Sequence, residues 1–221
     1  MANKNLTEMV FILDRSGSMA GLEGDTIGGY NSLLEKQRKE VGDATVTTVL
    51  FDDQYEMIHE HAAIGKVSDI TNKEYFARGM TGLLDAVGKT INHVGNRHKN
   101  ALDNEVPSKT MVVIITDGQE NASREFTLPQ IKKMIKRQKE KYGWEFLFLG
   151  ANMDAIDVAG RFGIEADRAV NYECDARGTE VNFRALSKAV SRVRNCDLEE
   201  MPTAFCDWKE EIEADYMARH K

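Results

Sequence analysis

Residues 9–19 read MVFILDRSGSM, an unbroken apolar run that stops abruptly at a charged, glycine-containing loop. Such a run is typical of a strand buried on both faces, as in a parallel sheet. Asp14, Ser16 and Ser18 follow the run directly, and Gly17 permits a tight backbone turn between the two serines. The segment therefore predicts a central strand whose end presents one carboxylate and two hydroxyls.

Further apolar runs and segments of helical spacing alternate along the rest of the chain. The runs cover residues 46–51, 111–115 and 146–149, and the helical spacing falls at residues 27–34, 84–94 and 128–142. Strands alternating with amphipathic helices indicate βαβ units and a parallel sheet covered on both faces. We expect an α/β fold with a doubly wound, mostly parallel central sheet, the arrangement called Rossmann-like.

One connection interrupts this alternation. Residues 45–51 and 55–61 both have strand character, and only the short segment 52–54 separates them, which predicts a hairpin and one antiparallel edge strand. We interpret Asp52 and Asp53 as turn residues, and His59 and His61 on the second strand as surface residues rather than metal ligands.

The last third continues with a predicted helix over 154–162, a weak strand over 169–172, and a helix with apolar positions between Val181 and Val193. We therefore assign one domain to residues 5–195. Residues 196–221 form a tail without a clear period, in which Phe205 and Trp208 are the candidate anchors to the body.

Two more oxygen-bearing residues come from the loops of this predicted sheet. The run 111–115 leads into Thr116-Asp117-Gly118, and Thr81 lies between glycines just before a predicted helix. In doubly wound sheets, ligands bind at the carboxyl ends of the strands, so these loops should meet there. Hydroxyls and two carboxylates suit Mg²⁺ or Mn²⁺, and suit Ca²⁺ less well because a high-coordination cage needs more carboxylates.

The Asp14-x-Ser16-x-Ser18 motif, Thr81 and Asp117-Gly118 resemble the metal-ion-dependent adhesion site of von Willebrand factor type A domains. The resemblance covers roughly residues 5–195 and is closest to the stand-alone intracellular type of bacteria and phages. It implies that Ser16, Ser18 and Thr81 bind the cation directly, and that Asp14 and Asp117 bind it directly or through water. It also implies a partner protein that supplies an Asp or Glu to an open coordination position. Candidates for the surrounding partner-binding rim are Met19, Leu22, Met80, Glu120 and Asn121.

Other interpretations of the same residues remain. Ser16, Ser18 and Thr81 could each cap a helix, and Asp117-Gly118 could be an ordinary turn. The chain has no P-loop, dinucleotide-binding or nucleophile-elbow motif, so we expect no enzyme. The alternative function is a Mg²⁺-dependent phosphoester hydrolase or phosphotransfer enzyme that uses Asp14 as nucleophile or ligand.

Composition limits the partners and the compartment. The 29 basic and 36 acidic residues give a formal net charge of -7, which disfavours nucleic acid. Neither a signal-peptide run nor a membrane span is predicted, and the three cysteines form no framework of pairs, so we expect a cytoplasmic protein without a membrane partner. The identity of the partner and the oligomeric state stay open.

Overall fold

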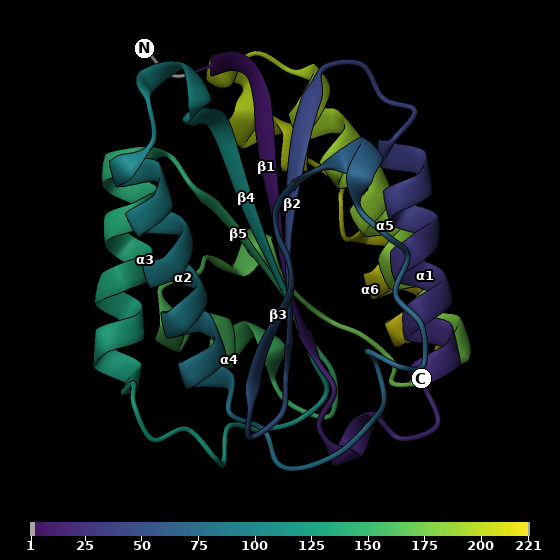
Figure 1. Cartoon of the computed structure of the whole chain (residues 1–221). Coiled ribbons are helices and arrows are strands. Elements are labelled where there is room, and N and C mark those ends of the chain that lie inside the picture. The colour runs from purple at the N-terminus through teal and green to yellow at the C-terminus, as the bar shows by residue number, and fades with distance from the viewer. Residues whose placement is uncertain (1–2, 221) are drawn as a thin grey trace.

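The computed structural model describes residues 3–220, which form one six-stranded sheet between two layers of helices (Figure 1). The strands follow the order β3-β2-β1-β4-β5-β6 across the sheet. Their bounds are β1 (Asn3–Asp14), β2 (Asp43–Phe51), β3 (Tyr55–Ala63), β4 (Pro107–Thr116), β5 (Glu145–Gly150) and β6 (Ala169–Asn171). All neighbouring pairs are parallel except β2 and β3. The predicted fold class, including the antiparallel edge strand, is confirmed.

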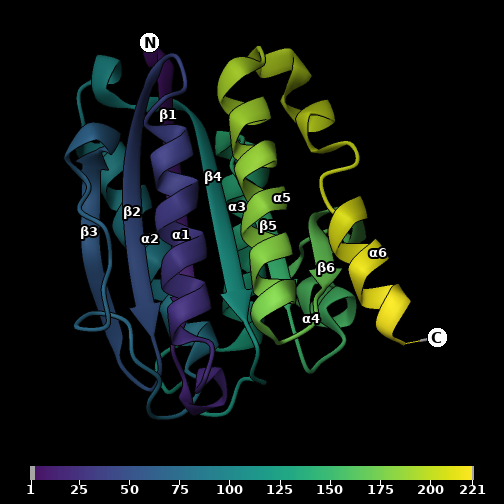
Figure 2. The ribbon, with the colours of Figure 1, turned by 90° about the vertical axis from the view of Figure 1, so that its right-hand side faces the viewer.

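The helices divide equally between the two faces of the sheet (Figures 1 and 2). One face carries α1 (Glu23–Gln37), α5 (Ala176–Asn195) and α6 (Glu210–Arg219), and the other carries α2 (Leu83–Asn100), α3 (Leu128–Tyr142) and α4 (Ala155–Phe162). The 3₁₀ helices are η1 (Gly17–Met19), η2 (Ile64–Lys66), η3 (Asp103–Glu105), η4 (Ala166–Arg168) and η5 (Leu198–Phe205). Each layer of helices encloses its own apolar core.

The apolar run of β1 supplies both cores. Met9, Phe11 and Leu13 pack toward α1 and α5, whereas Val10 and Ile12 pack toward α2 and α3. Successive side chains of a strand point to opposite faces, so a strand between two helical layers must be apolar at every position. Fully burying one such side chain contributes about 1.5–3 kcal/mol, which holds β1 in the middle of the sheet.

Strand order places the predicted metal loops together. The chain moves outward from β1 to β2 and β3 in one direction, then returns to start β4 on the other side of β1. The ends of β1 and β4 are therefore neighbours at the point where the winding direction changes, with Leu13 opposite Ile115. A crevice at this position is the usual ligand site of doubly wound sheets.

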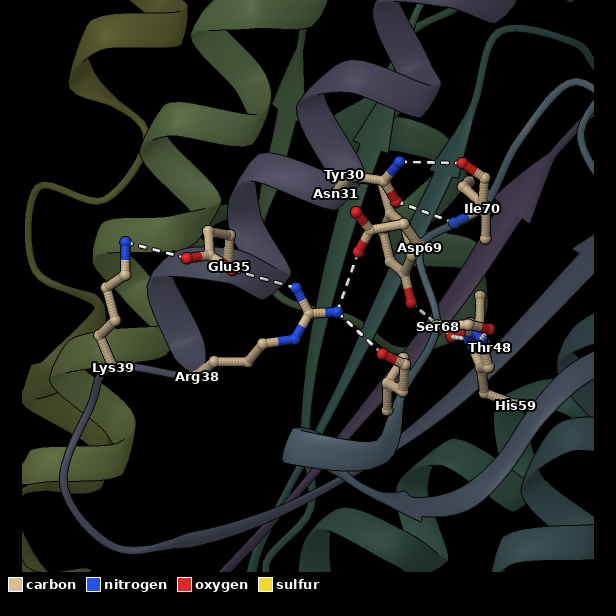
Figure 3. A network of polar contacts seen from close by, with 11 residues as sticks. Tyr30, Asn31, Glu35, Arg38, Lys39, Thr48, His59, Ser68, Asp69 and Ile70 are labelled. Carbon is tan, nitrogen blue, oxygen red and sulfur yellow. Dashed lines mark hydrogen bonds and ion pairs between the residues drawn. The ribbon is translucent and has the colours of Figure 1, made fainter.

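Residues 64–82, which we call the strap, connect β3 to α2 and run along α1. Figure 3 shows two attachments of the strap. The amide of Asn31 bonds both to the carbonyl and to the N–H of Ile70, at 2.9 and 3.0 Å. Arg38 donates to the Val67 carbonyl at 2.8 Å and pairs with Asp69 at 2.9 Å. These bonds attach residues 67–70 of the strap to α1 and its C-terminal end. The strap then ends at the carboxyl edge of the sheet, where Thr81 lies.

The tail beyond residue 195 packs against the domain. The candidate anchors Phe205 and Trp208 are both buried in the core on the α5 side, together with Ile212 of α6. The Trp208 indole N–H also donates to the Asp167 carbonyl at 2.8 Å. Across residues 3–220, no helix combines the length and the apolar character that crossing a membrane requires.

Candidate metal centre

Asp14 ends β1 at the carboxyl edge of the sheet, and only 1% of it is exposed. Its Oδ1 accepts a hydrogen bond from the backbone N–H of Ser16 at 2.7 Å. Its Oδ2 accepts one from the Thr116 hydroxyl at 2.5 Å. The Tyr75 hydroxyl donates to the Asp14 carbonyl at 2.5 Å, so the strap also fixes the backbone there. The side chain is held in one orientation.

The two serines connect this strand end to the end of β4. The Ser16 and Ser18 hydroxyl oxygens lie 3.1 Å apart. The Ser18 hydroxyl in turn donates to Asp117 Oδ1 at 2.6 Å. Asp117 is buried, whereas Ser18 is exposed, so the row of oxygens leads from the interior of the sheet edge to solvent.

Thr81 reaches the same place from the strap. Its N–H donates to Asn121 Oδ1 at 2.9 Å, and its carbonyl accepts from the N–H of Asn121 at 3.0 Å. The turn before Thr81 needs Gly79, because its φ of +66° favours glycine. A Cβ atom at this position would also collide with the Asp53 carboxylate. The Gly79 carbonyl accepts from the N–H of Gly17 at 3.1 Å, which joins the strap to the serine loop.

The three hydroxyls converge on one point beside Gly118. A Cβ atom built on Gly118 would lie 2.6 Å from Thr81 Oγ1, 3.3 Å from Ser18 Oγ and 3.6 Å from Ser16 Oγ. Because Gly118 has no side chain, the space in front of these three hard oxygen donors stays open, and such donors suit a small divalent cation. The structure brings together all five predicted metal residues, and their binding of a cation stays a prediction.

The charge of Asp14 lacks a basic neighbour. Among the described residues, no arginine, lysine or histidine forms an ion pair with Asp14 or Asp117. Burial raises the pKa of Asp14 to about 6, although the hydrogen bonds from Thr116 and Ser16 lower it, and the nearby Asp117 raises it further. A divalent cation would supply the missing positive charge.

Cys174 is a neighbour of the site that the sequence did not reveal. Its thiol donates to Asp117 Oδ2 at 3.5 Å. Burial, together with the negative charge of Asp117, raises the pKa of Cys174 to about 12, so the thiol stays protonated near neutral pH. It therefore acts as a weak donor that orients the carboxylate.

Arg15 and Asp52 form a second feature that sequence analysis missed. The buried Arg15 points away from Asp14, and its Nε pairs with Asp52 at 3.1 Å. Arg78 of the strap pairs with the same carboxylate oxygen at 2.6 Å. Asp52 does lie in the predicted hairpin turn, since its N–H donates to the Gln54 carbonyl, but it also connects the strap to β1. The one signal in the sequence for this ion pair was that Arg15 directly follows Asp14, the predicted metal ligand.

The five predicted rim residues occupy different environments. Met80 is 51% exposed and Asn121 is exposed, while Leu22 is partly buried. Met19 is buried in the core. Glu120 accepts hydrogen bonds from the backbone of α2 and of its own loop. Partner binding stays a prediction for all five, and Met19, Glu120 and Asn121 additionally have structural contacts.

No protein-family model matches the sequence, and no curated protein matches it either. Many solved structures are similar in fold. The pilus adhesin SpaC from Lactobacillus rhamnosus GG has a TM-score of 0.63 at 14% identity, over 84% of this chain and 30% of that chain. A variant of the PilB minor pilin from Streptococcus sanguinis has 0.56 at 12% identity, over 89% of this chain and 62% of that one.

A von Willebrand factor type A protein from Catenulispora acidiphila has a TM-score of 0.55 at 14% identity, over 84% of this chain and 42% of that chain. The present chain therefore spans less than two thirds of the length of each of these proteins. The similarities show the fold: this is a protein with the Rossmann-like fold of von Willebrand factor type A domains.

Proposed function

We propose that this chain is a divalent-cation-dependent protein-binding module. The cation would be Mg²⁺ or Mn²⁺, with Ca²⁺ less suitable, and when bound it would supply a Lewis-acid position for a carboxylate of the partner. Ser16, Ser18 and Thr81 would hold it directly, with Asp14 and Asp117 binding directly or through water. The observation that supports this most is the convergence of three hydroxyls on one point beside Gly118.

The donor set explains why the partner should be acidic. Three of the five candidate ligands are neutral hydroxyls, so the site neutralises a divalent cation less than a cage of carboxylates would. An incoming Asp or Glu side chain then gains more from the remaining positive charge. Because the contact is charge-assisted and directional, one acidic residue can contribute a large share of the affinity.

The chain's own residues prepare this contact before a partner arrives. Thr116 and the Ser16 N–H fix Asp14, and Asn121 fixes the backbone of Thr81. Little conformational entropy is then left to lose on binding. SpaC, which has a similar fold, is a pilus adhesin, and this agrees with an interaction module on this fold.

We also propose that the chain is not an enzyme. The rival phosphoester hydrolase would need Asp14 as a nucleophile or as an accessible ligand of the reaction. Asp14 is buried, and each of its carboxylate oxygens accepts a hydrogen bond, which disfavours its approach to a phosphorus atom as a nucleophile, although each oxygen keeps a lone pair for a cation. For the compartment we propose the cytoplasm, because Cys174, Cys196 and Cys206 are all free thiols.

The test is selection of displayed random peptides on the purified chain in Mg²⁺, followed by elution with EDTA. We expect the selected peptides to contain an Asp or Glu, and to lose binding when that residue is changed to Asn or Gln. Peptides that bind equally in EDTA would contradict the proposal. So would hydrolysis of p-nitrophenyl phosphate that disappears in Asp14→Ala.

A further inference from the structure

A cavity of about 430 Å³ lies at the carboxyl edge of the sheet, beside the candidate metal centre. Its walls come from the first turns of α2 and α3 and from one side of α4. Apolar side chains make up much of the lining, among them Leu84, Leu128, Met153 and Val158. We call it the Val158 cavity. Its size lies near the lower end of the range of about 300–1,000 Å³ for ligand pockets, so it can accept a complete side chain.

The Val158 cavity and the metal centre share a wall. Gly118 lines the cavity, and the same glycine leaves free the point surrounded by the three hydroxyls. Gly118 thus separates the candidate metal centre, where a partner's carboxylate would bind, from the Val158 cavity, where an apolar side chain would fit. In an extended peptide, side chains two positions apart lie on the same face at roughly 7 Å, whereas adjacent side chains point to opposite faces. One short segment can therefore occupy both places.

The shared wall is also rigid. The carboxylate of Glu120, which lines the cavity, accepts from the N–H of Leu84 at 2.8 Å and from the N–H of Ser123 at 2.7 Å. The Ser123 hydroxyl adds a third bond at 2.7 Å. The bond from Leu84 attaches the loop after β4 to the first turn of α2, and the two bonds from Ser123 hold the loop itself, so the cavity does not depend on a partner to form.

The rim of the cavity carries excess negative charge. Asp154 and Asp157 both line it, whereas Arg161 supplies a single positive charge and pairs with Asp157 at 2.7 Å. Asp154 is exposed and caps α4 by accepting from the N–H of Asp157 at 3.0 Å. A basic side chain beside the apolar one would complement this rim.

We propose that the Val158 cavity selects the partner: it takes an apolar side chain that lies two positions from the metal-binding carboxylate. The partner segment is then extended, with an Asp or Glu, a Leu, Ile, Met or Phe close by, and a Lys or Arg near the rim. This inference rests on the proposed function, since the carboxylate at the metal centre sets the position of the segment. Burial of the apolar side chain adds affinity, and the cavity adds sequence preference.

The experiment uses short synthetic peptides with one fixed central Glu and systematically varied neighbours, measured by fluorescence anisotropy in Mg²⁺ and in EDTA. Val158→Trp fills the cavity from α4, and Met153→Trp fills it from the preceding loop. Ile156→Trp is the matched control, because Ile156 belongs to the same helix, is 40% exposed and does not line the cavity. Calorimetric Mg²⁺ titration of each variant checks the metal centre separately.

We expect a clear preference for an apolar residue two positions from the Glu. Both cavity-filling variants should bind the preferred peptide roughly tenfold or more weakly, while Ile156→Trp and Mg²⁺ affinity stay unchanged. Mg²⁺-dependent binding without an apolar preference would overturn this inference and leave the proposed function standing. The inference is also overturned if Val158→Trp and Met153→Trp both bind like Ile156→Trp. Absence of both Mg²⁺ and peptide binding would overturn the two proposals together.

Discussion

Two buried carboxylates on the same strand, Glu8 and Asp14, have opposite electrostatic environments. Glu8 is fully buried in the middle of β1 and is paired by the protein itself. Arg97 and His98 of α2 each contact its Oε2 at 2.5 Å, and His61 lies 3.4 Å from its Oε1. Burial raises the pKa of Glu8, but the contacts with His61, His98 and Arg97 outweigh it and lower the pKa to about 2.

Asp14, at the carboxyl end of the strand, has neutral donors and a second carboxylate instead. Thr116 and Ser16 donate to it, Asp117 lies nearby, and its pKa rises to about 6. The adjacent Arg15 pairs with Asp52 rather than with Asp14. The comparison separates a structural carboxylate, which has its own countercharge, from one that no basic side chain of the described residues pairs with.

The largest effect is expected when the structural pair is broken. Glu8→Gln removes the charge that Arg97 and His98 face, and loss of one partner of a buried ion pair typically costs 3–5 kcal/mol. We predict a loss of about 3 kcal/mol in the free energy of unfolding, measured in urea, that is the same in Mg²⁺ and in EDTA. A loss below about 1 kcal/mol would mean that Glu8 has no structural role.

The two carboxylates should also respond oppositely to pH. The folded-state pKa of Asp14 is raised from 3.8 to about 6, so in EDTA its ionised form destabilises the protein, and stability from this group rises as pH falls through 6 toward 4. The folded-state pKa of Glu8 is lowered from 4.5 to about 2, so its stabilisation is complete above pH 4.5 and disappears as pH falls toward 2.

Urea unfolding of wild type, Asp14→Asn and Glu8→Gln across this pH range separates the two contributions. In EDTA near pH 7, we expect Asp14→Asn to be more stable than wild type by about 1–2 kcal/mol, and we expect this difference to vanish near pH 4. Glu8→Gln should lack the acid-induced loss below pH 4.5. A variant Asp14→Asn that is less stable than wild type in EDTA would show that Asp14 is a structural carboxylate too.

A smaller effect is expected at Gly118. Gly118→Ala places a methyl group 2.6 Å from Thr81 Oγ1, so the hydroxyls cannot surround a cation without moving. We predict at least a tenfold loss of Mg²⁺ affinity by calorimetry, equal to about 1.4 kcal/mol. Gly24→Ala is the control, because no atom lies within 4 Å of the added methyl group, and it should gain about 0.5–1 kcal/mol of stability with unchanged Mg²⁺ affinity. Equal Mg²⁺ affinity in both variants would exclude the point beside Gly118 as the binding position.

The sequence predicted the parts of this molecule that depend on local pattern. The unbroken apolar run of β1 indicated burial on both faces, and the short spacer 52–54 indicated the antiparallel hairpin; both are confirmed. Strand order then places the loops after β1 and β4 at the same edge of the sheet. Asp14, Thr81 and Asp117 could therefore be expected to lie close together although they are far apart in the chain.

Contacts between distant side chains had no such local signal. His61 appeared to be a surface residue, but register shifts between β2 and β3 and a positive φ of 44° bring its ring to Glu8. The pairing of Arg15 with Asp52 depends on the register of β1 against β2, in which Asp14 lies opposite Phe51, and the approach of Cys174 to Asp117 depends on how the chain turns after β6. None of these contacts has a period or motif in the sequence.

The most direct test of the account is the stabilisation that Mg²⁺ gives to wild type, Asp14→Asn and Glu8→Gln, measured by urea unfolding. At about 100 times its dissociation constant, a cation that binds only the folded state adds about 2.7 kcal/mol. We predict this gain for wild type and for Glu8→Gln, despite the lower stability of the latter, and little or none for Asp14→Asn. No gain in wild type, or an equal gain in Asp14→Asn, would contradict the claim that Asp14 is left unpaired in order to hold a cation.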